Sequence, residues 1–227
     1  MVDPTTVFDV NDSTIGVIVA GKPGSGKTYA LTQAGRGYLS KNTDPNYRIL
    51  CICPKQEGFE ELLAPKQQPA RTFDAMVKSY ERNTVTAYYP SMDDLEEKVD
   101  EAINFVFDTH DANEEPIRTI IVIDDAQVLI SPRSEASPAL KRLALTGRSR
   151  RIRLVAVSHN PVFNKSLDGQ IDTVWVFGET SPSYDRQFLE RYNYDAAKYR
   201  DQLIARRYSS VYYDVRGEPL LMAPIGE

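Results

Sequence analysis

Residues 15–28 read IGVIVAGKPGSGKT, an apolar run that passes directly into a glycine-rich loop. The loop matches the pattern G-x-x-x-x-G-K-[ST], in which glycines let consecutive backbone N–H groups turn inward around a phosphate. A helical pattern follows from Lys27 to about Leu39, and the positive N-terminal end of such a helix favours an anion at the same place. The order of strand, loop and helix therefore predicts a phosphate-binding loop.

The polar residues of this loop have predicted roles toward a bound nucleotide. Lys27 is expected to reach the β- and γ-phosphates, and the hydroxyl of Thr28 is expected to ligate Mg²⁺. The residues predicted to contact the nucleotide are Gly21, Lys22, Pro23, Gly24, Ser25, Gly26, Lys27, Thr28 and Tyr29. ATP and Mg²⁺ are thus the predicted cofactors.

A second apolar run, IIVI at residues 120–123, ends in two carboxylates, Asp124 and Asp125. Ligands of open parallel sheets bind at the carboxyl ends of the strands, so both acids are expected near the loop. Asp124 is the predicted Mg²⁺ acid, acting through water. Asp125 is the candidate general base that orients and deprotonates the attacking water.

A third buried run ends in polar residues, since residues 151–161 read RIRLVAVSHNP. A strand here, inserted next to the loop strand, places Ser158 to Asn160 near the γ-phosphate; simple strand termination by Asn-Pro is the alternative. The preceding residues 147–151 read GRSRR. An arginine donated to a neighbouring subunit's γ-phosphate stabilises phosphoryl transfer, whereas the same arginines could instead contact a DNA backbone.

Short apolar runs alternate with longer helical stretches along the rest of the chain. This alternation predicts an α/β fold with a mostly parallel central sheet flanked by helices. Further strands are expected at 47–53, 84–89 and 173–177, helices at 93–107, 138–146 and 188–201, and a terminal hairpin from 209–214 and 218–222 that turns at Arg216–Gly217. We expect a core over residues 1–180, and a C-terminal helix and β-hairpin over 181–227 appended to the same domain.

The composition is that of a soluble globular chain, with 41% apolar residues and a formal charge of −5. A chain of negative charge is not a nucleic-acid coat, so any contact with nucleic acid has to be local. Cys51 and Cys53 share one face of a strand and are expected to be reduced core thiols of a cytosolic protein. No apolar run approaches membrane-spanning length, and the acidic first residues predict no secretion signal.

Charge is unevenly spread along the sequence. Residues 91–115 hold ten acids against one lysine, and residues 133–153 hold seven bases against one acid. The acidic stretch is most simply a solvated face. The basic stretch directly precedes the polar strand end, and in a ring of subunits it would lie at the interface or the pore.

These motifs together resemble the FtsK–HerA superfamily of DNA-pumping ATPases, which are P-loop NTPases of the RecA/ASCE-like class. Within it, the short single-domain chain is similar to the genome-packaging ATPases of membrane-containing icosahedral viruses and phages. The resemblance covers roughly residues 13–180. Its most specific part is the third motif, Gly-Arg followed by a strand that ends S-x-x-P.

The resemblance implies an ATP-driven motor that translocates double-stranded DNA and packages a viral genome into a preformed capsid. It also implies a homo-oligomeric ring, docked by a capsid-vertex or membrane protein without inserting into the membrane itself. Its expected place is the host cytoplasm or the virion.

The resemblance further implies roles for single residues. Lys27 and Thr28 match the nucleotide-loop residues, and Asp124 matches the Mg²⁺ acid. Asp125 falls where many relatives carry a catalytic glutamate, and its side chain reaches less far. His159 falls where relatives often have a sensor glutamine, in a run that here reads Ser-His-Asn-Pro.

The resemblance also selects an arginine. Arg148 falls on the arginine that precedes the sensor strand, and it is the candidate finger for a neighbouring subunit, with Arg142 or Arg150 as substitutes.

Three other functions fit part of the pattern. A nucleotide-gated assembly or morphogenesis protein would keep the loop, with slow or absent chemistry. A small-molecule kinase would need an arginine-bearing lid and has no particular use for the Asp124–Asp125 pair. A GTPase fits less well, because residues 164–168, NKSLD, have one residue too many for the guanine-reading N-K-x-D. DNA-stimulated turnover separates the motor from these rivals.

Overall fold

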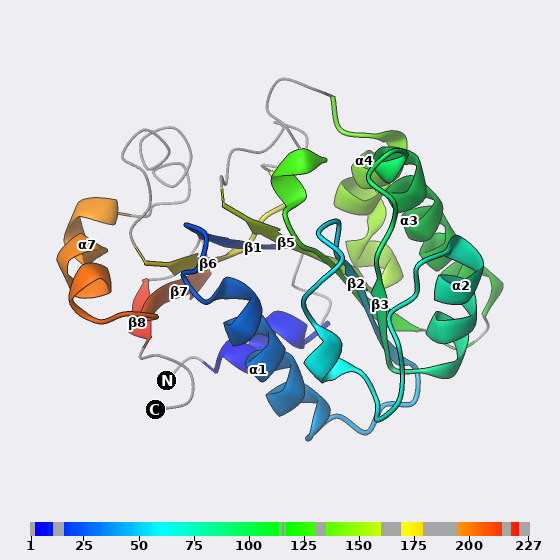
Figure 1. The fold of residues 1–227 in the computed structure, drawn as a ribbon, viewed down its shortest axis with the longest axis horizontal. Helices are drawn as coiled ribbons and strands as arrows, with labels where there is room; N and C mark the ends of the chain where they lie inside the picture. The colour runs from blue at the N-terminus through cyan, green and yellow to red at the C-terminus, as the bar shows by residue number, and fades with distance from the viewer. Residues whose placement is uncertain are drawn as a thin grey trace.

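The fold is built on one sheet (Figure 1). The structure, a computed structural model, describes residues 3–10, 16–113, 115, 117–129, 135–159, 169–178, 195–214 and 219–222. In these residues eight strands follow the order β3-β2-β4-β5-β1-β6-β7-β8. Their bounds are β1 Gly16–Gly21, β2 Tyr47–Ile52, β3 Val85–Tyr88, β4 Arg118–Ile123, β5 Ile152–Ser158, β6 Thr173–Phe177, β7 Ser210–Asp214 and β8 Leu220–Met222.

Strand direction divides the sheet into two parts. β1 to β6 pair in parallel, whereas β7 and β8 extend the β6 edge as antiparallel strands. The prediction of a mostly parallel sheet with a C-terminal hairpin is confirmed. The turn predicted at Arg216–Gly217 lies outside the described residues, and the division at residue 180 stays a prediction.

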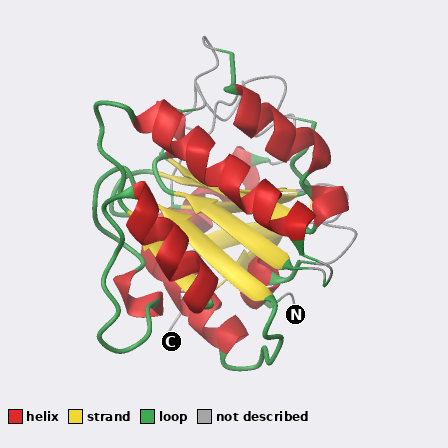
Figure 2. Ribbon diagram, turned by 90° about the vertical axis from the view of Figure 1, so that its right-hand side faces the viewer, coloured by secondary structure: helices red, strands yellow, loops and turns green. Residues whose placement is uncertain are grey.

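Helices cover both faces of the sheet (Figure 2). Their bounds are α1 Lys27–Leu39, α2 Phe73–Arg82, α3 Leu95–Ala112, α4 Pro138–Thr146 and α7 Ala196–Ala205, with short 3-10 helices at Pro4–Phe8, Glu60–Leu62, Ala126–Val128 and Arg148–Arg150. Side chains from α2, α3 and α4 pack into one apolar cluster, and those from α1 and Pro4–Phe8 pack into the other.

The central strands are mostly apolar because both of their faces are covered. Every residue of β1 and β5 is buried. Along β1, Ile18 and Ala20 join one cluster, while Val17 and Val19 join the other, as the alternation of side chains along a strand requires. This rigid centre fixes the carboxyl ends of β1, β4 and β5 beside one another.

The predicted strands agree with the structure to within about two residues, whereas some helices differ and the short 3-10 helices were not predicted. The helix expected at 93–107 runs instead over Leu95–Ala112. Helix α2 was not predicted. Residues 188–194 of the helix expected at 188–201 lie outside the described residues, and α7 begins at Ala196.

The two cysteines lie where the sequence predicts. Cys51 and Cys53 are buried, unbridged, and part of the same apolar cluster. Burial raises the pKa of both thiols, which keeps them protonated and unreactive.

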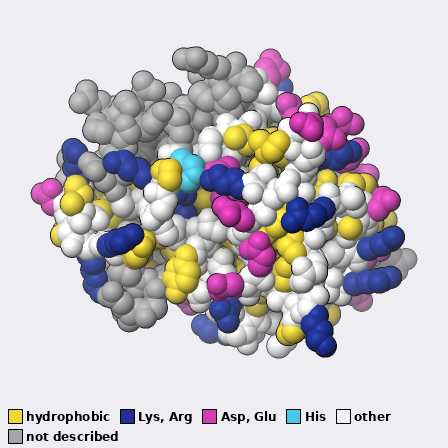
Figure 3. Space-filling model, in the orientation of Figure 1, with side chains coloured by type: hydrophobic (Ala, Val, Ile, Leu, Met, Phe, Trp, Pro, Cys, Tyr) yellow, Lys and Arg dark blue, Asp and Glu magenta, His cyan; other side chains and the backbone are white. Residues whose placement is uncertain are grey.

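The acidic and basic stretches partly neutralise each other, so neither is a free surface of one sign. Arg142 of α4 pairs with Asp108 and Asp111 of α3, and Arg150 also pairs with Asp111. Arg153 is buried within β5, so the expectation that it belongs to an exposed basic stretch is wrong. Acidic and basic side chains are interspersed over the described face in Figure 3. In the part of the chain that the structure describes, no helix is long and apolar enough to cross a membrane.

Candidate active site

The phosphate-loop residues connect the buried end of β1 to the first turn of α1. Gly26 caps α1 with a φ of +93°, a conformation that favours glycine. Gly21 has a φ of +151°, and a Cβ there would collide with the carbonyl oxygen of Phe177 on β6. The backbone therefore reaches its loop geometry through residues without side chains. The hydroxyl of Ser25 is buried and has no hydrogen-bond partner among the described residues, which fits a loop built to surround a phosphate.

The Lys27 ammonium is held by the phosphate loop itself and by His159. The ammonium donates to the carbonyl oxygens of Gly21 at 2.8 Å and Lys22 at 2.9 Å, and it contacts Nδ1 of His159 at 2.9 Å. Burial lowers the pKa of Lys27 to about 8, although Asp124 and Asp125 oppose the shift. The loop's own carbonyls thus accept hydrogen bonds from the Lys27 ammonium, which can donate to an incoming phosphate in their place.

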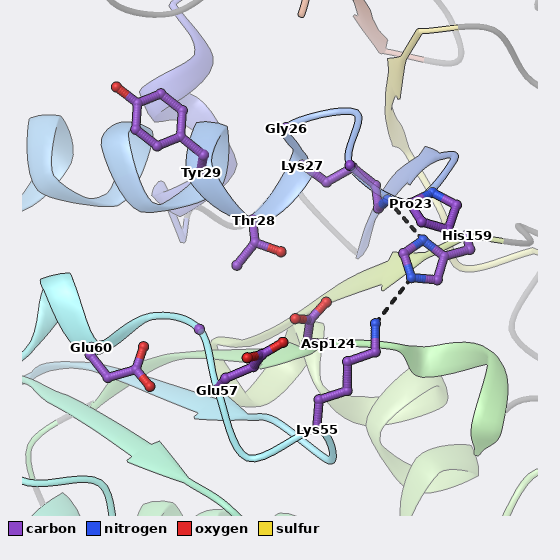
Figure 4. A pocket seen from close by; sticks show the side chains of 12 residues that line it. Pro23, Gly26, Lys27, Thr28, Tyr29, Lys55, Glu57, Glu60, Asp124 and His159 are labelled. Carbon is purple, nitrogen blue, oxygen red and sulfur yellow. Dashed lines mark hydrogen bonds between the residues drawn. The ribbon is translucent and has the colours of Figure 1, made fainter.

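A cavity of about 500 Å³ opens beside the loop (Figure 4). Its lining residues include Lys27, Thr28, Lys55, Glu57, Asp124 and His159. Tyr29 lies at its rim and points away from Asp124.

Thr28 and Asp124 are the residues that fit Mg²⁺. Both approach the backbone of Gly58, because a Cβ there would lie 3.3 Å from Cγ2 of Thr28 and 3.8 Å from Oδ2 of Asp124. A hydroxyl and a carboxylate are hard oxygen ligands of the kind that Mg²⁺ prefers. Burial and the charge of Asp125 raise the pKa of the Asp124 carboxyl, and a cation would offset both effects.

Asp125 is held by its neighbours and does not line the described part of the cavity. Its side chain is 4% exposed and forms an ion pair with Lys55, and Nε2 of Gln127 donates to Oδ1 at 3.0 Å. Burial opposes ionisation, but the hydrogen bonds from Lys55 and Gln127 outweigh it and lower the pKa of the Asp125 carboxyl. Asp125 is therefore a carboxylate, as a base must be, but one whose partners restrain it.

His159 joins the loop to this carboxylate. Lysine can only donate, so Nδ1 of His159 accepts from Lys27, and the neutral ring carries its proton on Nε2. Nε2 lies 2.9 Å from Oδ1 of Asp125 and donates to it. The Lys55 ammonium lies 3.2 Å from the same nitrogen (Figure 4). Burial, helped by the charge of Lys27, lowers the pKa of His159 and keeps the ring neutral.

Two residues of this arrangement were missed by the sequence analysis. Lys55 follows Pro54 in the loop after β2, where an isolated lysine carries no motif. Gln127 follows the acid pair, and its Oε1 accepts from the hydroxyl of Ser158 at 2.9 Å and the amide of His159 at 3.2 Å. The only available signal for Gln127 was its closeness to Asp125 in sequence.

The candidate finger lies away from its own cavity. Arg148 is exposed in the 3-10 helix before β5, whereas Ser158 and His159 lie at the other end of that strand. A strand of this length spans on the order of 20 Å. The carbonyl of Arg150 accepts from Nδ1 of His110, which ties the same turn to α3.

The phosphate loop follows β1, the acid pair ends β4, and β5 lies between these two strands. This arrangement defines a P-loop NTPase. Residues 6–137, more than half of the chain, match the family described as the AAA domain, and the protein belongs to this family. No curated protein sequence matches the chain.

Solved structures with the same fold include viral packaging enzymes. The genome packaging NTPase B204 of Sulfolobus turreted icosahedral virus 2, in complex with sulfate, has a TM-score of 0.71 at 18% identity, over 96% of this chain and 99% of that one. The DNA-packaging ATPase B204 of Sulfolobus turreted icosahedral virus gives 0.68 at 14% identity, over 96% and 100%. VirB4 of Thermoanaerobacter pseudethanolicus gives 0.66 at 12% identity, over 100% and 93%. The resemblance predicted from the motifs is confirmed at the level of fold.

Proposed function

We propose that the protein is a motor that hydrolyses ATP with Mg²⁺ to translocate double-stranded DNA, packaging a viral genome into a preformed capsid. The observation that carries the proposal is the convergence of Lys27, Thr28, Asp124 and His159 on one cavity. The likeness to two packaging enzymes, each matched over nearly its whole length, supports the same choice.

Hydrolysis would begin with a change of partners at Lys27. The ammonium leaves the carbonyls of Gly21 and Lys22 for the β- and γ-phosphates of ATP, where it stabilises the developing charge. Thr28 and Asp124 would hold Mg²⁺, which would supply positive charge to the phosphates. Water attacks the γ-phosphorus, the bond to the bridging oxygen breaks, and Asp125 takes the proton from the water.

Asp125 has to be released before it can act as this base. In the structure it is connected through His159 to Lys27. When Lys27 turns to a phosphate, Nδ1 of His159 loses its donor while Nε2 still contacts Asp125, so the ring would carry the change at the loop to this carboxylate. His159 would in this way report the presence of the nucleotide to Asp125.

The working unit in this proposal is a homo-oligomeric ring. Arg148 lies too far along β5 to serve its own cavity and is the arginine that would complete a neighbour's site. The exposed part of the basic stretch, without the buried Arg153, would contact DNA at the interface or pore. A capsid-vertex or membrane protein would dock the ring in the host cytoplasm or on the virion.

One observation favours a second function, that of a nucleotide-gated assembly protein with slow chemistry. Asp125 is buried and held by Lys55, Gln127 and His159, and such a carboxylate does not reach a bound nucleotide without rearrangement. In that case ATP binding would change the assembly state, with little turnover.

The deciding experiment is ATP turnover with and without duplex DNA, run beside a measurement of particle size in ATP. The motor is expected to assemble in ATP and to turn over faster with DNA. Assembly without turnover supports the second function. Wild-type turnover in Lys27→Ala would overturn both, because the phosphate loop is then not the site.

A further inference from the structure

An aromatic ring from the C-terminal part of the chain packs on the phosphate loop. A Cβ placed on Gly26 would lie 3.1 Å from Cδ1 of Tyr208 and 3.8 Å from its Cε1 and Cγ. The ring therefore covers the bare Cα of the residue that caps α1. No sequence motif links residue 208 to the loop.

The backbone of Tyr208 is strained, and its side chain remains accessible to solvent. Tyr208 has a φ of +66°, in the left-handed region that residues other than glycine seldom occupy. Strained residues of this kind cluster at ligand-binding positions. The side chain is nevertheless 45% exposed, and the guanidinium of Arg207 lies 4.7 Å from the ring centroid. Burial of the ring in the core thus does not explain its position.

The strand order shows which end of a nucleotide would meet this ring. β1, which leads into the loop, lies between β5 on one side and β6 on the other, and β7 follows β6. Asp124 and His159 follow β4 and β5, so the γ-phosphate belongs on that side. Tyr208 lies two residues before β7, on the opposite side, where the α-phosphate and the nucleoside of the same molecule must lie.

We infer that the Tyr208 ring is the platform on which the base of the bound nucleoside triphosphate stacks. The inference rests on the proposed function, since it assumes that ATP occupies the loop. Base–aromatic stacking is tolerant of base identity, because every base has a π-face. Tyr208 would therefore raise the affinity for ATP and GTP alike, and selection between them would need other contacts.

The test compares nucleotides with a ligand that has no base. Equilibrium binding of ATP, GTP and inorganic tripolyphosphate is measured for the wild type, Tyr208→Ala and Tyr208→Phe. Loss of the ring is expected to weaken ATP and GTP binding about 5- to 150-fold and to leave tripolyphosphate binding unchanged. Tyr208→Phe, which keeps the ring, should stay within about twofold of wild type.

Two further variants control for the backbone and for the surface. Tyr208→Asn removes the ring, but asparagine tolerates the left-handed backbone, so it should reproduce Tyr208→Ala if stacking is the cause. Ile204→Ala removes another exposed apolar side chain, from the end of α7, and should bind all three ligands as the wild type does.

Each other outcome has a definite meaning. Equal loss of ATP and tripolyphosphate affinity would show that the ring only supports the loop, and no loss of either would show that it does not touch the nucleotide; both overturn the inference. If the wild type binds neither ATP nor tripolyphosphate, the proposed function itself fails, and that result is distinct from a failure of Tyr208.

Discussion

Lys27 is kept charged only marginally, because burial lowers its pKa to about 8. In the free protein a growing fraction of the side chain is neutral above pH 8. Bound phosphates favour the ammonium and raise its pKa, so ATP binding takes up a proton in that range. The affinity for ATP should fall by up to about tenfold for each pH unit above 8. Calorimetric titrations between pH 7 and 9.5, in buffers of different ionisation heat, measure both the fall and the proton uptake.

Lys27→Arg is the matched control for this prediction. A guanidinium stays charged across the range, so whatever affinity the variant retains should not fall above pH 8 through this residue. A wild-type affinity that is constant to pH 9.5 would show that Lys27 does not approach the phosphates.

Changing Asp125 to asparagine should have a different effect on the enzyme from changing Asp124 to asparagine. Asp125→Asn keeps the shape of the side chain but cannot take a proton, so it should bind ATP normally and lose about 10²-fold or more of turnover. Asp124→Asn should instead bind ATP with an affinity that no longer depends on the Mg²⁺ concentration. Steady-state turnover, together with nucleotide binding at several Mg²⁺ concentrations, distinguishes the two.

Normal turnover by Asp125→Asn would place the base elsewhere. Glu57 is then the first alternative, because it lines the cavity and its side chain points toward Asp124 in Figure 4. Glu57→Gln, measured in the same assay, is therefore the companion variant.

Single residues could be predicted where a motif carries them and not elsewhere. The loop, the acid pair and His159 each end an apolar strand, and the parallel sheet brings those ends together. Lys55 reaches Asp125 only because β2 pairs with β4, a neighbour relation that no local pattern reveals. Arg153 lies in the run RIRLVAV, and the sequence does not indicate that carbonyl oxygens accept hydrogen bonds from its buried guanidinium.

At the scale of elements, Arg153 attaches the N-terminal 3-10 helix to β5. Its Nη1 donates to the carbonyls of Thr6, Val7 and Asp9 at 2.9–3.0 Å, and its Nη2 lies 3.8 Å from Oδ1 of Asp172. Arg153→Ala removes this donor from the buried carbonyl of Val7 and this positive charge from beside the buried carboxylate of Asp172, so it should lower the free energy of unfolding by about 3–5 kcal/mol. Urea unfolding monitored by circular dichroism measures the loss.

A surface ion pair supplies the control for Arg153. Arg118 lies 3.5 Å from Asp44, and its side chain is 43% exposed. Arg118→Ala should cost less than about 1 kcal/mol, as exposed pairs usually do. Equal effects of the two variants would mean that the contacts of Arg153 contribute no more than a surface pair.

The elements themselves could be predicted to different degrees. Parallel strands covered on both faces read as unbroken apolar runs, which made β1, β4 and β5 plain. Helix α2 was missed because only Met76 and Tyr80 of its ten residues are buried. The available signals were the Met76–Tyr80 spacing and Thr72, whose side chain accepts from the amide of Ala75 as an N-cap.

At the scale of the whole molecule, the sequence shows how many charges each of the two stretches holds, but not which acids and bases form ion pairs. Contacts between α3 and α4 bring Arg142 and Arg150 to Asp108 and Asp111, so these arginines already have partners within the chain. Arg148 stays the candidate for a function between subunits because of its position, at the end of β5 that lies away from its own cavity. The ion pairs leave fewer bases for DNA than the sequence suggested.

A ring with a finger supplied by the neighbour makes a prediction that DNA contact does not. Arg148→Ala alone and Lys27→Ala alone should both be inactive, since a lost finger typically costs 10³–10⁵ in rate. In an equal mixture, some interfaces pair an intact loop from one subunit with an intact arginine from the next. Random assembly makes this about a quarter of the interfaces, so part of the turnover should return. Turnover titrated against the mixing ratio measures the recovery.

Recovery has to be separated from a change in DNA binding and from a general effect of losing an arginine. If Arg148 only touched a DNA phosphate, Arg148→Ala would weaken DNA binding and reduce the slope of log affinity against log salt concentration by about one unit. Turnover without DNA would be unchanged. Arg36→Ala removes an exposed arginine paired with Glu61 on another surface, and should be active without mixing. If the mixture stays inactive and the protein is a monomer in ATP at every concentration, the ring motor is excluded. ATP binding at the loop would survive that result, because Lys27, Thr28 and Asp124 come from a single subunit.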